Sequence, residues 1–360
     1  MKIAMYCDSL YGRGGQTRVQ IELANYLNAD IITSGYDPKI KKWLPINNKV
    51  IDIGNITYKY SQAFSYYFEA PLRFIFCTDY KYDVYIFNGT SSIFASKKGR
   101  KNIWLCYSPN RLLHDLKEWK LMNSGFFKRV FFHLHIFLFE LLDRKVIRNN
   151  FEDIVAISKT VKKRIKKYYD LDAQVIYPPI NRSKYRFSKF GDYYLAVSRL
   201  MPEKRMDLVA SIFTKIRNKR LILVGDGVEK NKIEEIIKDS RNIKLLTKVN
   251  DNELVDLYSN CLAVIYLPKD EDYGLVPLEA MASGKICIAV NEGGCLETVV
   301  NNKTGYLVDP SEESIIRAIK KVDNSKLDLM KKYCISQASR FTEDISNKQW
   351  DKIMEKYKSN

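Results

Sequence analysis

Residues 263–290 read AVIYLPKDEDYGLVPLEAMASGKICIAV, and this stretch contains one complete strand–helix–strand unit. Short apolar runs at its two ends predict strands at 263–266 and 286–290. Between them Pro277 has the fixed φ that suits a first helical turn, so we expect a helix over 277–283. Strands that alternate with helices in this way form βαβ units with a mainly parallel sheet.

The same alternation continues outward along nearly the whole chain and is weak only between residues 36 and 80. The first half has expected strands at 2–6, 30–33, 84–87, 103–106 and 153–156, with helices at 17–27 and 126–148. The second half has expected strands at 193–197, 220–224, 243–246, 263–266 and 286–290, with helices at 206–217, 230–240, 251–259, 277–283 and 312–322. This pattern predicts an α/β protein made of two Rossmann-like domains.

Length and a proline pair place the boundary between these domains. A chain of 360 residues exceeds what one hydrophobic core usually supports. Pro178 and Pro179 can neither join a sheet ladder nor continue a helix, and the polar stretch 181–191 follows them. We expect domains at 1–182 and 183–340, with a final segment at 341–360. Ligands bind outside the carboxyl ends of parallel strands, so two facing domains predict a site in an interdomain cleft.

Composition narrows the function class without naming it. The net charge of +17, from 59 Lys plus Arg against 42 Asp plus Glu, favours anionic partners, although a lysine-rich proteome explains it equally well. Seven cysteines form an odd set without a C-x-x-C pair, which favours reduced thiols in a cytoplasmic protein. The N-terminus reaches an acid at Asp8, too early for a signal peptide, and the longest apolar run, 130–142, is too short to span a membrane.

Two glutamates carry the most informative chemistry. Glu271 and Glu279 bracket a glycine-containing loop that enters the helix after Pro277. The first-turn N–H groups of such a helix are a ready site for a phosphate. Carboxylates on either side can accept hydrogen bonds from sugar and ribose hydroxyls.

This setting resembles the E-x7-E signature of the family 4 glycosyltransferases, and the resemblance continues through residues 291–299 and 304–308. It implies the two-domain GT-B fold and retaining transfer from a nucleotide-sugar. In relatives the first glutamate orients the donor sugar hydroxyls and the second holds the donor ribose, which assigns these roles to Glu271 and Glu279. The resemblance also places three residues around the diphosphate and sugar: Gly274, Leu275 and Val276.

The segment 197–205 resembles a second family element, G-R-L-x-x-x-K-G. Arg199 and Lys204 would neutralise the donor diphosphate, because a planar fork and a point charge both suit phosphate oxygens. The family glycines are replaced here by Ser198 and Arg205, and the bulky Arg205 is expected to alter the loop. Glu271 is expected to act as an orienting group rather than as a nucleophile.

Two further turns of the second domain resemble donor-binding elements. Gly225 and Gly227 follow a strand and match the family's G-x-G turn below the nucleotide, although any tight turn after a strand requires a glycine. Val249 precedes the helix that begins at 251 and would lie near the base.

The first domain contributes a glycine loop and an acceptor-side segment. Gly14 and Gly15 open a helix after the first strand; their spacing fails the G-x-G-x-x-G dinucleotide pattern and resembles the family's loop that approaches donor phosphate and acceptor. The segment 106–115 resembles the family's Y-x-H-S/T-P-x-R-Y-x-x-D element and supplies three acceptor-side candidates, Tyr107, Arg111 and His114. The family histidine is Tyr107 here, a poor base near neutral pH. A position on a helix surface explains His114 better than a role at the acceptor does.

The resemblance sets the remaining expectations. The first domain binds a glycan or lipid-linked acceptor, the second binds the nucleotide-sugar donor, and the helix around Trp350 crosses back to the first domain. No acidic D-x-D pair stands out and His133 and His135 do not share a helical face, so neither a metal nor another cofactor is expected. Basic clusters at 97–101, 126–148 and 159–167 suggest attachment to an anionic membrane face rather than to nucleic acid. Two rivals stay open: another GT-B enzyme, an epimerase or phosphorylase, and a non-catalytic membrane- or anion-binding protein.

Overall fold

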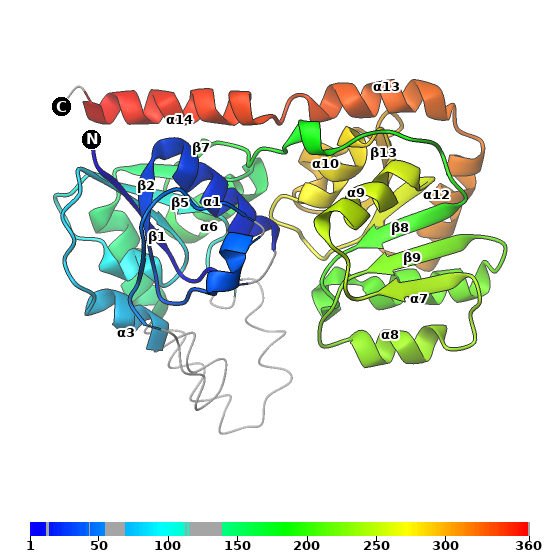
Figure 1. Ribbon diagram of the computed structural model, residues 1–360, viewed down its shortest axis with the longest axis horizontal. Helices are drawn as coiled ribbons and strands as arrows, with labels where there is room; N and C mark the ends of the chain where they lie inside the picture. Colours follow the sequence, from blue (N-terminus) through cyan, green and yellow to red (C-terminus); the bar gives the residue numbers. More distant parts are fainter. Residues whose placement is uncertain (12–13, 43, 55–68, 112–113, 115–138, 359–360) are drawn as a thin grey trace. The chain divides into compact units, whose positions relative to one another are not determined.

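The computed structural model describes residues 1–11, 14–42, 44–54, 69–111, 114 and 139–358. They fall into two compact units (Figure 1). The N-terminal unit contains Met1–Pro178 and Asn347–Asn360, and the C-terminal unit contains Pro179–Ser346. The boundary therefore lies between the two prolines, just before the expected position at 182.

The N-terminal unit is built on a parallel sheet. Its described residues form seven strands in the order β3-β2-β1-β4-β5-β6-β7. Every residue of the three central strands β1, β4 and β5 is buried, as expected for a sheet covered on both faces. The strands are β1 (Ile3–Cys7), β2 (Ala29–Thr33), β3 (Val50–Asp52), β4 (Val84–Asn88), β5 (Asn102–Cys106), β6 (Asp153–Ala156) and β7 (Gln174–Val175).

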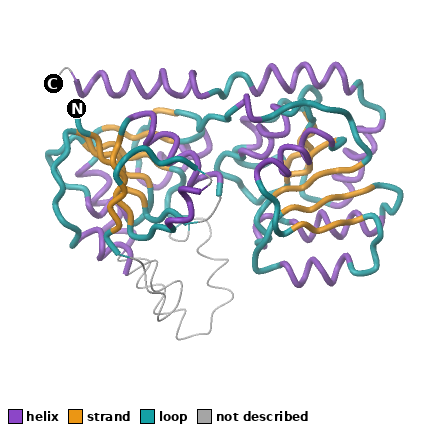
Figure 2. Tube along the Cα trace, in the orientation of Figure 1, coloured by secondary structure: helices purple, strands orange, loops and turns teal. Residues whose placement is uncertain are grey.

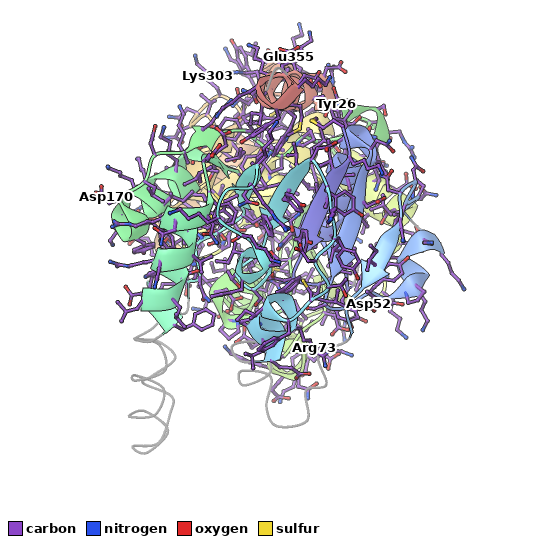
Figure 3. All side chains as sticks on the ribbon, turned by 90° about the vertical axis from the view of Figure 1, so that its left-hand side faces the viewer. Tyr26, Asp52, Arg73, Asp170, Lys303 and Glu355 are labelled. Carbon is purple, nitrogen blue, oxygen red and sulfur yellow. The ribbon has the colours of Figure 1, made fainter. Side chains whose placement is uncertain are left out.

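Helices cover both faces of this sheet (Figure 2). They are α1 (Gly15–Leu27), α3 (Ala70–Ile75), α6 (Lys159–Tyr169) and the 3-10 turns η1 (Pro38–Lys42) and η3 (Ser92–Ala95). Residues 139–150 are also helical, which is the described part of the helix expected over 126–148. The chain's last helix, α14 (Glu343–Lys358), returns to this unit, where Asp351 accepts a hydrogen bond from Tyr26 of α1 (2.8 Å) and Lys356 pairs with Asp153 of β6 (2.8 Å). Figure 3 labels Tyr26 beside this helix.

The C-terminal unit repeats the architecture. Its described residues form six parallel strands in the order β10-β9-β8-β11-β12-β13. They are β8 (Tyr193–Val197), β9 (Arg220–Val224), β10 (Ile243–Leu246), β11 (Ala263–Tyr266), β12 (Cys287–Val290) and β13 (Gly305–Val308). The chain moves outward from β8 in one direction and from β11 in the other. Because crossovers between parallel strands are right-handed, the helices of these two halves cover opposite faces of the sheet.

Two helix layers enclose that sheet. Helices α7 and α12 contact each other in one layer, and α10 and α13 contact each other in the other. The helices are α7 (Met206–Lys215), α8 (Lys230–Ile237), α9 (Asp251–Asn260), α10 (Leu275–Ala282), α11 (Cys295–Thr298), α12 (Glu312–Asp323) and α13 (Leu327–Ala338), with turns η4 (Arg182–Lys184) and η5 (Pro202–Lys204). The sequence did not predict α13 or the edge strands β3, β7 and β13, which are short or only partly apolar.

Two further features concern the cysteines and the possibility of a membrane-spanning helix. All seven cysteines are unpaired, and every one except Cys77 is buried. Across the described residues, no helix is both long and apolar enough to cross a bilayer.

A buried lysine lies in the core of the C-terminal unit. The side chain of Lys285 is fully buried, its ammonium lies 4.4 Å from the ring centre of Phe187 and 4.8 Å from that of Phe190, and it donates to the carbonyl of Lys189. Burial lowers the pKa of Lys285 from 10.5 to about 8. The folded protein therefore holds the charged form at a cost below pH 8.

Replacing Lys285 with methionine is expected to stabilise the protein by about 1–3 kcal/mol near pH 7. Between pH 8 and 10.5 the unfolded chain binds more protons at Lys285 than the folded chain, so wild-type stability rises and the gap to the variant shrinks. Denaturant unfolding of the wild-type protein and the Lys285→Met variant between pH 7 and 10.5 measures this difference in stability. Lys331→Met, which removes a partly exposed lysine 4.4 Å from the same Phe187 ring, is the control; an equal, pH-independent gain in both variants would contradict the assignment.

Candidate functional site

The order of strands in the C-terminal unit creates one natural ligand position. The chain proceeds from β8 toward β10 on one side and from β11 toward β13 on the other, so the topology reverses between β8 and β11. Loops that leave the carboxyl ends of strands at such a reversal diverge and leave room for a ligand. The loop after β8 carries Arg199 and Lys204, and the loop after β11 carries Glu271.

Lys204 and Glu271 meet across this reversal. The ammonium of Lys204 lies 2.5 Å from Oε2 of Glu271, and the side chains are only 14% and 17% exposed. Tyr266, the last residue of β11, also donates a hydrogen bond to Glu271. The backbone N–H of Lys269 donates to the carbonyl of Glu203 (2.7 Å), which fastens the two loops together. A cation and an acid are thus held side by side at the expected donor position.

Arg199 is presented differently. Its side chain is exposed, and within the described part of the chain it makes no ion pair. A guanidinium that is not engaged by a protein acid remains available for a bound anion.

The two glycines after β9 are required by the loop that carries Arg199. Gly225 has φ +155°, and a Cβ at this position would lie 1.8 Å from the carbonyl oxygen of Ser198. Gly227 has φ +154°, and a Cβ there would lie 2.4 Å from the carbonyl oxygen of Leu200. The backbone N–H of Leu200 donates to the backbone carbonyl of Asp226 (2.9 Å), which joins the loop after β8 to the loop after β9. These glycines therefore support the arginine loop through close backbone approach.

Arg205 occupies the position of the family glycine and adopts the glycine conformation, with φ +52°. Its guanidinium donates to Glu292 (3.1 Å) and to the carbonyl of Leu267 (3.3 Å), while Glu292 also accepts from the N–H of Asp270 (2.9 Å). These contacts offset part of the strain of an arginine in the left-handed region. The sequence did not anticipate this pairing, since 87 positions separate the two partners.

Glu279 is held by two tyrosines that sequence reasoning missed. Tyr185 donates to Oε1 and Tyr258 to Oε2, each at 2.8 Å. Both tyrosines are buried, whereas Glu279 is only half-buried. Burial, and then the charge of Glu279, raise the pKa of Tyr258 well above its usual value, so Tyr258 remains a donor. An acid with fixed orientation and partial exposure can accept further hydroxyls.

The remaining expected donor residues lie on the same sheet edge of the C-terminal unit. Gly274 has φ +87° and caps α10, whose first two residues are Leu275 and Val276. A glycine cap has no side chain to satisfy the first-turn N–H groups, which leaves them open to an anion. Val249 is half-buried between β10 and α9.

In the N-terminal unit, Gly14 is an exposed N-cap of α1 and Gly15 is the first helical residue. A Cβ on Gly14 would have no atom within 4 Å, so packing does not explain the glycine. In the same unit, the half-buried carboxylate of Asp8 accepts from the N–H groups of Thr90 and Ser92 (2.8 and 2.7 Å) and fixes the loop after β4 beside β1.

The three acceptor-side candidates lie after β5. The hydroxyl of Tyr107 is buried, and burial raises its pKa well above the usual value, so Tyr107 stays protonated at neutral pH. Arg111 lies half-buried in the following turn. The ring of His114 stacks on Tyr168 at 4.0 Å and meets Tyr169 edge-on, which adds a packing role. His133 and His135 lie outside the described residues.

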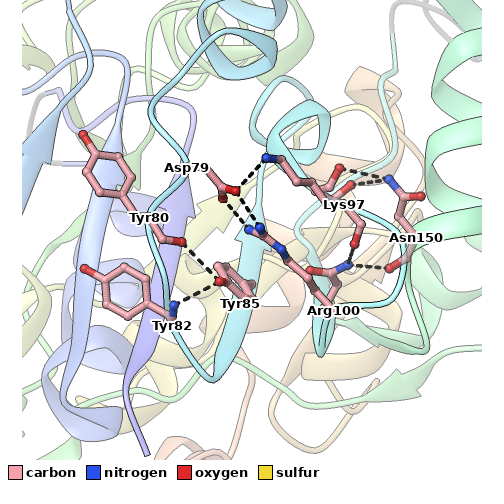
Figure 4. Close-up of polar contacts among 9 residues, drawn as sticks. Asp79, Tyr80, Tyr82, Tyr85, Lys97, Arg100 and Asn150 are labelled. Atoms are coloured by element: carbon pink, nitrogen blue, oxygen red, sulfur yellow. Dashed lines mark hydrogen bonds and ion pairs between the residues drawn. The ribbon is translucent and has the colours of Figure 1, made fainter.

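Acidic and basic side chains elsewhere are used in structural contacts. Among the described residues, no group of three His, Cys, Asp or Glu side chains is arranged to hold a metal ion. In the basic cluster at 97–101, Lys97 and Arg100 pair with Asp79 (2.8 and 2.7 Å), and Lys101 donates to the carbonyl of Tyr357 (3.2 Å). Figure 4 shows Asp79 between Lys97 and Arg100.

Comparison with known proteins identifies the C-terminal unit. Residues 179–341 match the family model of glycosyl transferases group 1. The C-terminal unit thus resembles the group 1 glycosyltransferases over almost all of its length, and the chain is a glycosyltransferase. The glycosyltransferase is 28% identical over 333 residues to the alpha-1,3/1,6-mannosyltransferase ALG2 of Dictyostelium discoideum, covering 78% of this chain and 76% of the relative. It is 29% identical over 226 residues to the O-antigen chain mannosyltransferase RfbU of Salmonella typhimurium, covering 59% and 60%.

Solved structures agree on the fold of the glycosyltransferase. Sucrose-phosphate synthase from Thermosynechococcus elongatus superposes with a TM-score of 0.80 at 15% identity, covering 99% of both chains. HepE from Anabaena, in complex with UDP, superposes with a TM-score of 0.77 at 17% identity, covering 99% of this chain and 100% of the other. The glycosyltransferase therefore has the GT-B fold, as the sequence predicted.

Proposed function

We propose that this glycosyltransferase transfers a hexosyl or N-acetylhexosaminyl group from a UDP- or GDP-sugar to a glycan or lipid-linked acceptor, with retention of anomeric configuration. The observation that carries the proposal is the Lys204–Glu271 pair at the topological reversal between β8 and β11. Lys204 and Arg199 neutralise the donor diphosphate. Glu271 orients the hydroxyls of the transferred sugar and Glu279 holds the ribose.

This division of roles follows from where charge develops. As the glycosidic bond to the diphosphate breaks, negative charge accumulates on the leaving phosphate, and fixed cations beside it stabilise the transition state more than the ground state. Lys204 is fixed by its half-buried ion pair with Glu271 and needs little reorganisation. Because two cationic side chains supply this charge, the proposal includes catalysis without a divalent metal.

The relatives suggest the first donors to test. ALG2 and RfbU are both named mannosyltransferases, so GDP-mannose heads a donor panel that also contains UDP-glucose, UDP-galactose and UDP-N-acetylglucosamine. A ligand that binds only the folded state raises the unfolding temperature. The best donor is then incubated with candidate acceptors in the presence of EDTA, and NMR of the product gives its anomeric configuration.

The outcomes separate the rival functions. Acceptor-dependent release of nucleoside diphosphate, unaffected by EDTA and with the donor's anomeric configuration in the product, supports the proposal. Donor conversion without acceptor would favour an epimerase, and sugar phosphate formed from free phosphate would favour a phosphorylase. An inverted product would contradict retention.

Peripheral attachment to the cytoplasmic membrane face is the second part of the proposal. Helix α6 presents the exposed lysines Lys163 and Lys167, and basic surfaces attract anionic lipid. We expect the protein to co-sediment with liposomes containing phosphatidylglycerol at low salt, and the Lys163→Glu/Lys167→Glu variant to bind several-fold less. Equal sedimentation with neutral liposomes, or equal binding by the variant, would contradict this part.

A further inference from the structure

The segment before β8, residues 184–190, is fastened along the C-terminal unit, and we call it the strap. Lys184 pairs with Asp251 of α9 at 2.6 Å, and Arg186 pairs with Asp256 of the same helix. The backbone N–H groups of Ser188 and Lys189 donate to the carbonyl of Ser259. The strap is therefore bound to α9 by side chains and backbone together.

Tyr185 is the strap residue that reaches the donor acid. Its buried hydroxyl donates to Oε1 of Glu279, between the two ion pairs that hold its neighbours to α9. Tyr258, from α9 itself, donates to Oε2, and the two tyrosine rings meet edge-on at 6.0 Å. The strap and α9 therefore share the task of fixing one carboxylate on α10.

Hydrogen-bond capacity indicates what this arrangement is suited to bind. Each carboxylate oxygen can accept two hydrogen bonds, so one acceptor position remains on each oxygen after the tyrosines have donated. Two remaining acceptor positions match two neighbouring hydroxyls, such as the 2′ and 3′ hydroxyls of a ribose. A freely rotating glutamate would lose this match and would pay conformational entropy on binding.

We propose that Tyr185 and Tyr258 are positioning residues that fix Glu279 for a ribose diol, so that the strap sets the enzyme's preference for ribonucleotide over 2′-deoxyribonucleotide donors. This inference rests on the proposed function, in which Glu279 holds the donor ribose. The tyrosines act through Glu279 and touch no reacting atom.

The test is titration calorimetry of the full chain with UDP, GDP and their 2′-deoxy counterparts. Wild-type protein is expected to bind its preferred ribonucleoside diphosphate roughly tenfold more tightly than the 2′-deoxy form, since a hydrogen bond to a charged group is lost. Tyr185→Phe is expected to weaken binding of the ribonucleotide by roughly five- to tenfold and to weaken the 2′-deoxy form, which keeps only its 3′ hydroxyl on Glu279, by less, so that the preference falls toward one.

A matched control separates positioning from stability. Tyr193→Phe removes a hydroxyl that donates to the carbonyl of Leu257 on α9 (2.8 Å) and does not reach Glu279, so the ribose preference should persist. Tyr258→Phe is the second test variant and should also reduce the ribose preference. It carries the test if Tyr185→Phe does not fold.

Three results would overturn the inference, each in a different way. An unchanged ribose preference in both tyrosine variants would refute the positioning role and leave the enzyme assignment intact. If the wild-type protein binds the ribonucleotide and the 2′-deoxyribonucleotide equally tightly and still transfers sugar, Glu279 does not hold the donor ribose. Failure of the wild-type protein to bind any nucleoside diphosphate would remove the proposed donor class itself.

Discussion

Replacing Lys204 with methionine is expected to lower kcat for sugar transfer about 10²–10³-fold while the protein remains folded. Methionine keeps most of the side chain's length and removes its charge, so the diphosphate leaving group loses one of its two cations. Glu271 loses its 2.5 Å ion pair but keeps the hydrogen bond from Tyr266 and partial access to solvent. The effect should therefore appear mainly in catalysis, measured as initial rates of nucleoside diphosphate release with saturating donor.

Lys215→Met is the matched control for that substitution. Lys215 also forms a 2.6 Å ion pair, with Glu312, but both side chains are largely exposed and lie on α7 and α12. Exposed ion pairs of this kind contribute little to stability, so the control variant should stay folded and keep wild-type activity. If Lys204→Met retains more than about one third of wild-type kcat, Lys204 does not stabilise the leaving group.

Gly225→Ala is expected to cause the second large effect, a loss of about 2–4 kcal/mol of stability together with donor binding weakened at least tenfold. The new Cβ would lie 1.8 Å from the carbonyl oxygen of Ser198, a backbone atom that cannot rotate away. The loop that carries Arg199 must therefore move. Chemical unfolding and calorimetry with nucleoside diphosphate measure the two consequences separately.

Gly99→Ala isolates the cost of backbone conformation. Gly99 also has a positive φ, +81°, but a Cβ there would meet nothing within 4 Å. This variant should lose only about 1 kcal/mol and bind donor normally. Normal donor binding by Gly225→Ala as well would show that the Arg199 loop is not part of the donor site.

Much of the fold follows from local patterns in the sequence. The apolar runs at 193–197 and 263–266 form strands with the expected bounds, because strands buried on both faces read as continuous hydrophobic segments. The edge strand β7 (Gln174–Val175) has no such run, since an edge strand of two residues buries little surface. Helix α13 was missed for a related reason: only a narrow set of its residues is buried, among them Met330 and Cys334.

The site was only partly accessible to the same reasoning. Lys204 and Glu271 could be singled out from local motifs, and the structure brings them together although 67 positions separate them. The contacts of Tyr185 with Glu279 and of Arg205 with Glu292 depend on tertiary packing over 94 and 87 positions. A tyrosine in a polar stretch carries no sign of such a partner, so these contacts required the three-dimensional structure.

The most direct test of this account is a crystal structure of the full chain with its preferred nucleoside diphosphate bound. We expect phosphate oxygens within about 3 Å of the Lys204 ammonium and the Arg199 guanidinium, with the ribose hydroxyls on Glu279. A diphosphate bound away from both cations, or a ribose that does not contact Glu279, would contradict it.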